Sequence, residues 1–175
     1  MVAKYTGKAY VLNISNINNT KDNIVMLFDT GAMKTVLPLS LLTEKSLDEE
    51  DRNTFKNRIR NDVSKETFSS VSGISNIEGY LCKAENIMIS GMYFKTFYYY
   101  LIVDELCKSA LIGDDFISCC RFEHSVNGDI EINDFDEKAY INKHEKYALT
   151  GKEILAALSQ NTSKKKYTAQ DITVN

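Results

Sequence analysis

An aspartate follows directly on a run of five apolar residues near the start of this chain. The run, Ile24 to Phe28, is typical of a strand buried on both faces, and Asp29, Thr30 and Gly31 come next. An ionised side chain at the end of such a strand is unfavourable unless something holds it, so the chain must fold around this carboxylate. Thr30 can supply a hydroxyl, and Gly31 leaves room for a backbone or a ligand. An Asx-type turn that only ends the strand is the alternative, because Asp-x-Gly is common.

A second motif of the same kind follows later in the chain. Residues 110–112 form another short apolar run, which ends at Gly113 and continues into an acidic helix start at Asp114 and Asp115. Between the two motifs, Gly73 lies in a segment that predicts a hairpin. In this order the motifs resemble the retropepsin-like aspartic proteases, which include the retroviral proteases and their bacterial and domesticated relatives. The family pattern is apolar-apolar-Asp-Thr/Ser-Gly-Ala, a flap hairpin with a glycine, and apolar-apolar-Gly-x-Asp/Asn-x-Leu/Ile.

The resemblance, which covers roughly residues 8–133, implies roles for particular residues. Asp29 would be the catalytic residue, Thr30 would bond to the equivalent loop of a partner subunit, and Gly31 would bond the substrate backbone. Support of the catalytic loop is implied for Thr30, Gly31, Gly113 and Asp115. Contact with a bound peptide is implied for the flap and pocket residues Ala32, Ser72, Gly73 and Ile74, and for the further pocket walls Thr35, Val36 and Ile112. Plain core packing is the alternative for each apolar residue of that set.

Catalysis in this family requires two carboxylates that share one proton. Like charges a few Å apart cannot both ionise, so one carboxyl polarises the peptide carbonyl while the other activates water. The chain contains a single Asp-Thr-Gly motif, at Asp29. The resemblance therefore implies a homodimer with the site on its two-fold axis and with no metal or cofactor. The expected function is that of an aspartic endopeptidase acting on peptide or protein substrates.

The pattern of apolar residues predicts a mostly β fold. Strands are expected over 8–15, 24–28, 35–37, 66–71, 80–89, 94–103, 121–124 and 129–132. Ser46 and Glu49 have the spacing of a capping box and predict an inserted surface helix over about 46–60. A second short helix is expected over 115–120. By resemblance the strands form a retropepsin-like closed barrel, the half-lobe of an acid protease, with a flap hairpin.

Residues 134–175 extend beyond the segment that resembles the family, so the protease domain is expected to span 1–133. Thr150 and Glu153 form a second capping-box pattern and predict a short helix over about 151–160 with one apolar face. The lysine-rich tail that follows is expected to be flexible. About forty residues cannot bury a core alone, so we expect the extension to dock on the barrel as an accessory.

The net charge and the hydropathy of the chain argue against binding to nucleic acid and insertion in a membrane. A net charge of −3 gives no electrostatic reason to expect nucleic acid, and no apolar stretch approaches the length of a membrane span. The N-terminus lacks the apolar core of a signal peptide, so a cytoplasmic protein is expected. A zinc site from Cys119, Cys120 and His124 is the alternative to free thiols, although its ligand spacing is poor. The three tyrosines at 98–100 are expected to pack in a sheet, since no Arg or Lys interleaves with them for nucleic-acid stacking.

Two other functions fit parts of the sequence. One is a catalytically inactive retropepsin-like module that binds peptides or dimerises, because a fold does not fix a function. The intact motif at Asp29 favours catalysis over this alternative. The other is a β-barrel that binds a small ligand or nucleic acid, which only the generic strand pattern favours. Lys34 and Asp114 reverse the charges of an ion pair that supports the dimer in retroviral members, which predicts either a charge-swapped pair or none.

Overall fold

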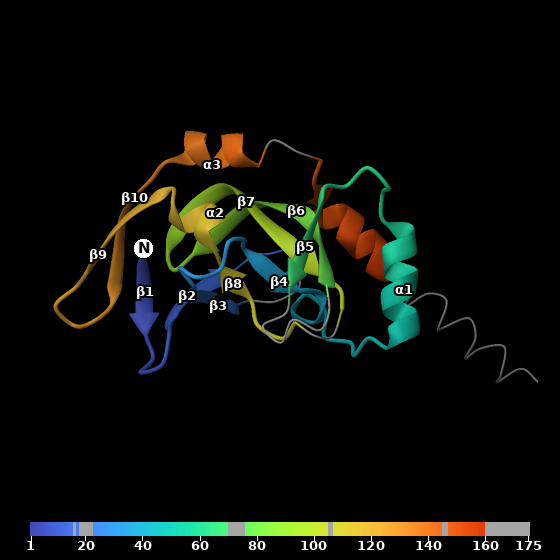
Figure 1. Ribbon diagram of the computed structural model, residues 1–175, viewed down its shortest axis with the longest axis horizontal. Coiled ribbons are helices and arrows are strands. Elements are labelled where there is room, and N and C mark those ends of the chain that lie inside the picture. The colour runs from blue at the N-terminus through green and yellow to red at the C-terminus, as the bar shows by residue number, and fades with distance from the viewer. Residues whose placement is uncertain (16, 18–22, 70–75, 105–106, 145–146, 160–175) are drawn as a thin grey trace, which may run out of the picture.

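Six strands pair in a closed ring to form a β-barrel. The computed structural model describes residues 1–15, 17, 23–69, 76–104, 107–144 and 147–159. The barrel strands are β2 (Tyr10–Ser15), β3 (Ile24–Phe28), β4 (Val36–Pro38), β6 (Asn76–Ile89), β7 (Met92–Ile102) and β8 (Leu111–Ile112). They follow one another in the order β6–β7–β4–β8–β3–β2, and pairing of β2 with β6 closes the ring (Figure 1). The predicted mostly β fold with a closed barrel is confirmed.

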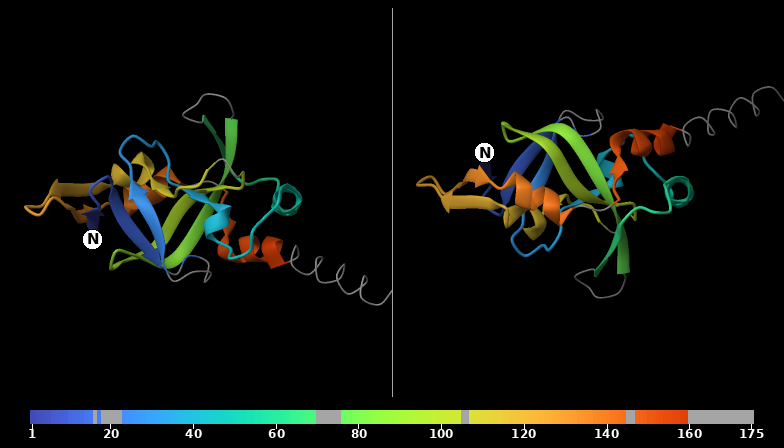
Figure 2. Two further views of the ribbon diagram at one scale, coloured as in Figure 1. Left: turned by 90° about the horizontal axis from the view of Figure 1, so that it is seen from below. Right: turned by 90° about the horizontal axis from the view of Figure 1, so that it is seen from above.

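The sheet continues beyond β2 into three outer strands. These are β1 (Val2–Tyr5), β9 (Cys120–His124) and β10 (Ile130–Phe135). β1 pairs with β2, and the β9–β10 hairpin joins β1 through β10. Asp129 fastens this junction, because its carboxylate accepts hydrogen bonds from the Tyr5 N–H at 2.9 Å and the Lys4 ammonium at 3.0 Å, which lower its pKa. The hairpin therefore projects from one end of the molecule, with β9 outermost (Figures 1 and 2).

Strand β3 has the predicted bounds but not the predicted burial. Ile24, Met26 and Phe28 are buried, whereas Val25 between them is 55% exposed. The expectation of burial on both faces is wrong, because a barrel wall buries its inner face and leaves alternate residues outside. The apolar run is therefore a strand of the barrel wall. Its alternate residues, up to Phe28 at its end, point into the core, and its outer face is not covered.

Side chains cap the inserted helix but not the shorter helix that follows β8. α1 (Glu49–Arg58) is the predicted insertion, but its capping box is formed by Asp48 and Asp51 and not by Ser46 and Glu49. The Asp48 carboxylate accepts from the Asp51 N–H at 2.7 Å, and the Asp51 carboxylate accepts from the Asp48 N–H at 3.1 Å. A shorter helix, α2 (Asp114–Ile117), follows β8, in place of the predicted 115–120. In the described parts of the chain, we find no helix with the length and apolarity needed to cross a bilayer.

The C-terminal extension packs into the same core as the barrel. It contains α3 (Glu137–Lys143), which the sequence did not predict, the short strand β11 (Leu149–Thr150) on β6, and a helix over 151–159. The Thr150 hydroxyl accepts from the Glu153 N–H at 3.3 Å, as the second capping-box pattern predicts. The extension contributes to the core the buried residues Tyr140, Leu149, Ile154 and Ala157. The predicted boundary after 133 falls inside β10, and buried residues on both sides of it belong to one core.

Tyrosines 98–100 pack in this core along β7. Their exposed fractions are 8%, 0% and 2%, so the packing interpretation is confirmed. The Tyr140 hydroxyl accepts from the Tyr98 N–H at 2.8 Å, which anchors α3 to the strand. Burial raises the pKa of Tyr100 to about 12 and that of Tyr140 well above its usual value, so both hydroxyls stay protonated near neutral pH.

Because extension and barrel share a core, a cavity in the C-terminal helix should destabilise the whole domain. We expect Ile154→Ala to lower the free energy of unfolding by about 2–5 kcal/mol in one cooperative transition. Urea denaturation followed by circular dichroism measures this loss. The control Tyr147→Ala removes a side chain that is 66% exposed and should change stability by less than about 0.5 kcal/mol. Equal stability of Ile154→Ala and the control would show that the helix does not belong to the core.

Candidate active site

The aspartate of the first motif and the glycine of the second lie side by side. β3 and β8 are neighbouring parallel strands with Phe28 opposite Ile112, so the residues that follow them meet at one edge of the sheet. The N–H of Asp29 donates to the carbonyl of Ile112 at 3.0 Å and extends this ladder. The residue after Ile112 is Gly113. The structure therefore brings the two sequence motifs together, and it leaves the Asp29 side chain half-buried.

The loop after Asp29 is folded around one oxygen of its carboxylate. Asp29 Oδ1 accepts from the Gly31 N–H at 2.9 Å, and the Asp29 carbonyl accepts from the Ala32 N–H at 3.2 Å. A Cβ on Gly31 would approach Oδ1 to 3.3 Å, so glycine keeps this contact open. The turn has the Asx geometry that the alternative interpretation proposed, and it also orients the carboxylate. Thr30 is exposed, and no group within the described chain bonds its hydroxyl.

Gly113 is required because α2 begins directly against the loop. A Cβ at this position would lie 2.5 Å from the Lys34 carbonyl carbon and oxygen and 2.8 Å from the Ala32 oxygen, which is too close for any other residue. The first N–H groups of α2 bond the same loop: Asp114 donates to the Ala32 carbonyl at 2.7 Å, and Asp115 donates to the Met33 carbonyl at 3.3 Å. Gly113 and the start of α2 thus fix the path of residues 32–34.

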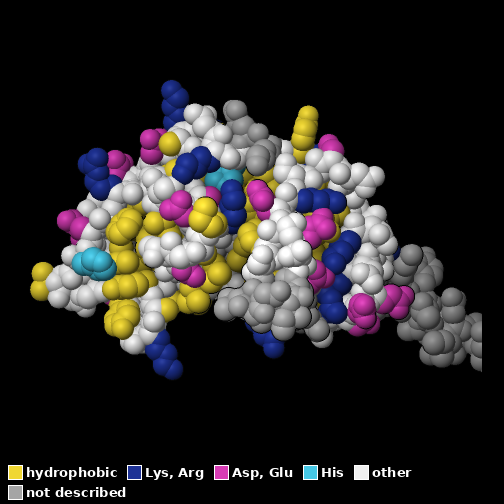
Figure 3. Space-filling view, in the orientation of Figure 1, with side chains coloured by type: hydrophobic (Ala, Val, Ile, Leu, Met, Phe, Trp, Pro, Cys, Tyr) yellow, Lys and Arg dark blue, Asp and Glu magenta, His cyan; other side chains and the backbone are white. Residues whose placement is uncertain are grey.

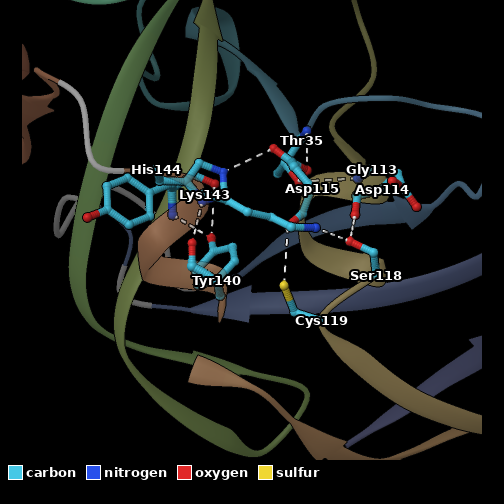
Figure 4. Close-up of polar contacts among 10 residues, drawn as sticks. Thr35, Gly113, Asp114, Asp115, Ser118, Cys119, Tyr140, Lys143 and His144 are labelled. Atoms are coloured by element: carbon cyan, nitrogen blue, oxygen red, sulfur yellow. Dashed lines mark hydrogen bonds and ion pairs between the residues drawn. The ribbon is translucent and has the colours of Figure 1, made fainter. Parts of the chain in front are cut away.

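A buried carboxylate ties this loop to the core. Asp115 Oδ1 accepts from the Thr35 N–H at 2.9 Å and from the Thr35 hydroxyl at 2.7 Å, while the same hydroxyl accepts from the Gly113 N–H at 3.2 Å (Figure 4). Thr35 is fully buried, so it supports the loop and does not line an open pocket. Gly113 and Asp115, for which the resemblance implies a role in loop support, thus both bond to Thr35. Val36 and Ile112, also considered as pocket walls, are buried in the core.

The second oxygen of Asp115 faces the C-terminal extension. His144 Nε2 lies 3.4 Å from Asp115 Oδ2, and its Nδ1 lies 2.8 Å from the Tyr140 carbonyl oxygen (Figure 4). A carbonyl only accepts, so Nδ1 carries a hydrogen, and the Nε2–Oδ2 contact is favourable only with a proton between the two atoms. The ring of His144 stacks on Tyr98 at a centroid distance of 4.7 Å. Asp115 and His144 therefore form a buried pair beneath the loop.

The sequence interpretation missed His144 and Tyr140. Tyr140 belongs to α3 and His144 is its C-cap, and the N-cap Asp136 precedes Tyr140 by the same interval as Tyr140 precedes His144. Residues at i, i+4 and i+8 lie on one face of a helix, so this spacing could have predicted a helix here. Nothing in the sequence alone places that face against Asp115. The pairing depends on tertiary packing.

The predicted flap can be described only at its base. β5 (Lys65–Ser69) pairs with β6 from Lys65 opposite Tyr80 to Ser69 opposite Asn76, which makes a hairpin. The predicted tip residues Ser72, Gly73 and Ile74 lie outside the described residues. Ala32, predicted to contact substrate, lies half-buried in the loop between Asp29 and β4.

Lys34 and Asp114 do not form an ion pair within the described chain. The Lys34 ammonium lies 5.9 Å from the centroid of the Tyr100 ring, a cation–π arrangement. Asp114 contributes its backbone N–H to the loop, as the first residue of α2. The idea of a charge-swapped pair within one subunit is therefore wrong, because the Lys34 ammonium lies over the Tyr100 ring instead.

The four cysteines are free thiols. Burial raises the pKa of Cys119 and raises that of Cys120 to about 12, so both stay protonated near neutral pH. Their sulfurs lie near the carbonyls of the preceding α2 turn. Across the described residues, His, Cys, Asp and Glu side chains gather nowhere in a group of three that could hold a metal ion.

Comparison with known proteins assigns no family. A scan against protein-family models gives no match, and a search of curated proteins finds no similar sequence. The site has to be interpreted from its own geometry. That geometry is a half-buried carboxylate on a tightly bonded loop, with a buried Thr35–Asp115–His144 network beneath it.

The network predicts that the Thr35 hydroxyl is essential to the loop. Thr35→Val keeps the shape of the side chain but leaves the Gly113 N–H unbonded and removes one donor from Asp115. We expect the free energy of unfolding to fall by about 1–3 kcal/mol, measured by urea denaturation. Thr67→Val, on the exposed face of β5, is the matched control and should change stability by less than about 0.5 kcal/mol. A Thr35→Val variant as stable as the control would contradict this role.

Proposed function

We propose that this chain is an aspartic endopeptidase of the retropepsin-like type, whose active site is formed by two copies. The observation that carries the proposal is the placement of Asp29. Its carboxylate is half-buried at the end of a barrel strand, and one oxygen is oriented by the Gly31 N–H at 2.9 Å. The other oxygen accepts no hydrogen bond from the described residues, which leaves it free for a water molecule.

Among the residues that the structure describes, the other carboxylates of this site do not suit the role of the second catalytic group. Asp115 belongs to the same site, but its side chain is only 6% exposed and both of its oxygens are engaged by Thr35 and His144. Asp114 points to solvent from the first turn of α2. A water-activating pair therefore needs Asp29 from a second copy, as the single Asp-Thr-Gly motif also suggests.

The chemistry follows from two Asp29 carboxyls facing each other. Two like charges at short range favour a state with one shared proton. The ionised carboxylate removes a proton from a water held between them, and that water attacks the scissile carbonyl. The protonated carboxyl donates to the carbonyl oxygen as it becomes negative. The C–N bond then breaks, and the leaving nitrogen takes the proton that the other carboxylate removed from water. The reaction needs no metal and no covalent intermediate.

The substrate in this proposal is a peptide bound as an extended strand. The β5–β6 hairpin extends away from the barrel and would close over a peptide through residues 72–74. Gly31 and Ala32 lie on the loop beside Asp29 and would contact the substrate backbone. Main-chain hydrogen bonds give affinity in this mode, and pockets for alternate side chains give specificity.

The proposal predicts that Asp29 is indispensable for cleavage. We expect Asp29→Asn to lower the rate of cleavage of a mixed peptide library, followed by mass spectrometry, by about three orders of magnitude or more. The fold should remain, because the change removes a like-charge pair and keeps an oxygen for the Gly31 N–H.

Asp62→Asn is the control for this prediction, since Asp62 is an exposed carboxylate with a 57% exposed side chain. It should cleave like the wild type. Full cleavage by purified Asp29→Asn would end the protease proposal. Peptide binding without cleavage by both proteins would instead favour the inactive peptide-binding module.

The shared site also predicts that activity depends on protein concentration. Each subunit supplies half of the pair, so specific activity should fall when dilution separates the dimer. A dilution series assayed against one cleaved peptide measures this fall. Constant specific activity from a protein that sediments as a monomer would contradict the two-copy site.

A further inference from the structure

We propose that two copies of this chain join through the open edges of β9, paired antiparallel about Phe122. The inference rests on the proposed function, because that function requires a second copy to supply the other carboxylate. It adds the surface, the register and the charges through which the copies recognise each other.

β9 is an open edge of the sheet. Among the described strands it pairs only with β10, and it lies outermost in the hairpin at one end of the molecule (Figure 1). The Ser125 N–H donates to the Asp129 carbonyl at 2.8 Å, so Ser125 and, by alternation, Glu123 face β10. The backbone N–H and C=O of Phe122 therefore face the open side. Such unpaired groups are a template for another strand.

The charges on β9 are self-complementary in one register. Arg121 and Glu123 flank Phe122, and all three side chains are exposed. When two copies pair antiparallel with Phe122 opposite Phe122 of the partner subunit, each Arg121 lies opposite a Glu123 on the same face. Centring the pair on Arg121 or on Glu123 would oppose like charges, and a one-residue slip would exchange the two faces. Only the Phe122-centred register satisfies both pairs.

The hairpin itself leaves a charge conflict that this register relieves. Glu123 lies directly opposite Glu131 of β10, a like-charge pair on one face of the sheet. In the described chain Glu123 is bonded only by the Asn133 amide at 2.7 Å, and Arg121 takes part in no ion pair. Arg121 of the partner subunit would place a positive charge beside these two carboxylates.

The other face of β9 links the edge to the candidate active site. The Phe122 ring is 39% exposed and meets the Phe28 ring edge-on at a centroid distance of 5.7 Å. Phe28 directly precedes Asp29, so a pairing centred on Phe122 brings the two Asp29 loops toward one axis. Apolar side chains gather on the half of the surface that holds β1, β2, β9 and β10 (Figure 3). Tyr5 of β1 is itself 51% exposed.

Charge reversal in the full-length chain tests the proposal. Sedimentation velocity over a concentration series gives the dimer dissociation constant of the wild type, Arg121→Glu, Glu123→Arg and the double variant. Either single reversal places two like-charge pairs across the axis and should raise the dissociation constant about tenfold or more. The double variant restores both pairs with their signs exchanged and should return to within about threefold of the wild type.

The chain offers a matched control on another strand. Lys83 and Glu85 of β6 have the same basic-apolar-acidic spacing and lie 3.3 Å apart, but β6 is paired on both sides, with β7 and β11. Lys83→Glu and Glu85→Arg should leave the dissociation constant unchanged. A wild type that stays monomeric throughout the series would overturn the proposal, as would a dimer that neither single reversal weakens, or a double variant no better than the singles.

Failure of the interface and failure of the proposed function give different results. If the reversals and their rescue behave as expected but no peptide is cleaved, the β9 pairing stands and the protease proposal falls. If peptides are cleaved through Asp29 while Arg121→Glu dimerises normally, the copies meet through another surface and the β9 proposal falls.

Discussion

The buried carboxylate of Asp115 is the contact on which the rest of the site depends. One of its oxygens accepts two hydrogen bonds from Thr35, and the other faces the ring of His144. These bonds connect the start of β4, the first turn of α2 and the end of α3. A buried carboxylate that loses its partners destabilises a protein by several kcal/mol, so these elements are held together as a unit. The loop that carries Asp29 rests on this unit through the bonds of residues 32–35.

The site thus contains two aspartates in opposite environments. Asp115 is enclosed and fully bonded, whereas Asp29 is half-buried and bonded through one oxygen. A saturated carboxylate is suited to a structural role, and an accessible one on a rigid loop is suited to chemistry. In our proposal each chain supplies one half of a water-activating pair. Two copies would pair through the open edge of β9, where Phe122 contacts Phe28, and this two-fold dimer would bring the two Asp29 carboxyls together.

Local features of the sequence predict local structure well. The run from Ile24 to Phe28 has the bounds of β3 because its apolar residues are continuous, and Thr150 caps its helix as its spacing to Glu153 predicts. The start of α1 was misplaced because two capping-box patterns overlap here, and the helix begins with the later one, formed by Asp48 and Asp51. The carboxylate Asp29 and the glycine Gly113 could be found from motifs. His144 could not, because its role arises only when α3 packs beside α2.

Mixing active and inactive subunits tests the central claim, that each active site needs Asp29 from two copies. Wild-type protein is allowed to exchange subunits with increasing amounts of Asp29→Asn, and peptide cleavage is measured per wild-type subunit. A shared site predicts that this activity falls in proportion to the wild-type fraction, since mixed dimers carry one catalytic carboxylate. Activity per wild-type subunit that stays constant at every ratio would contradict the account.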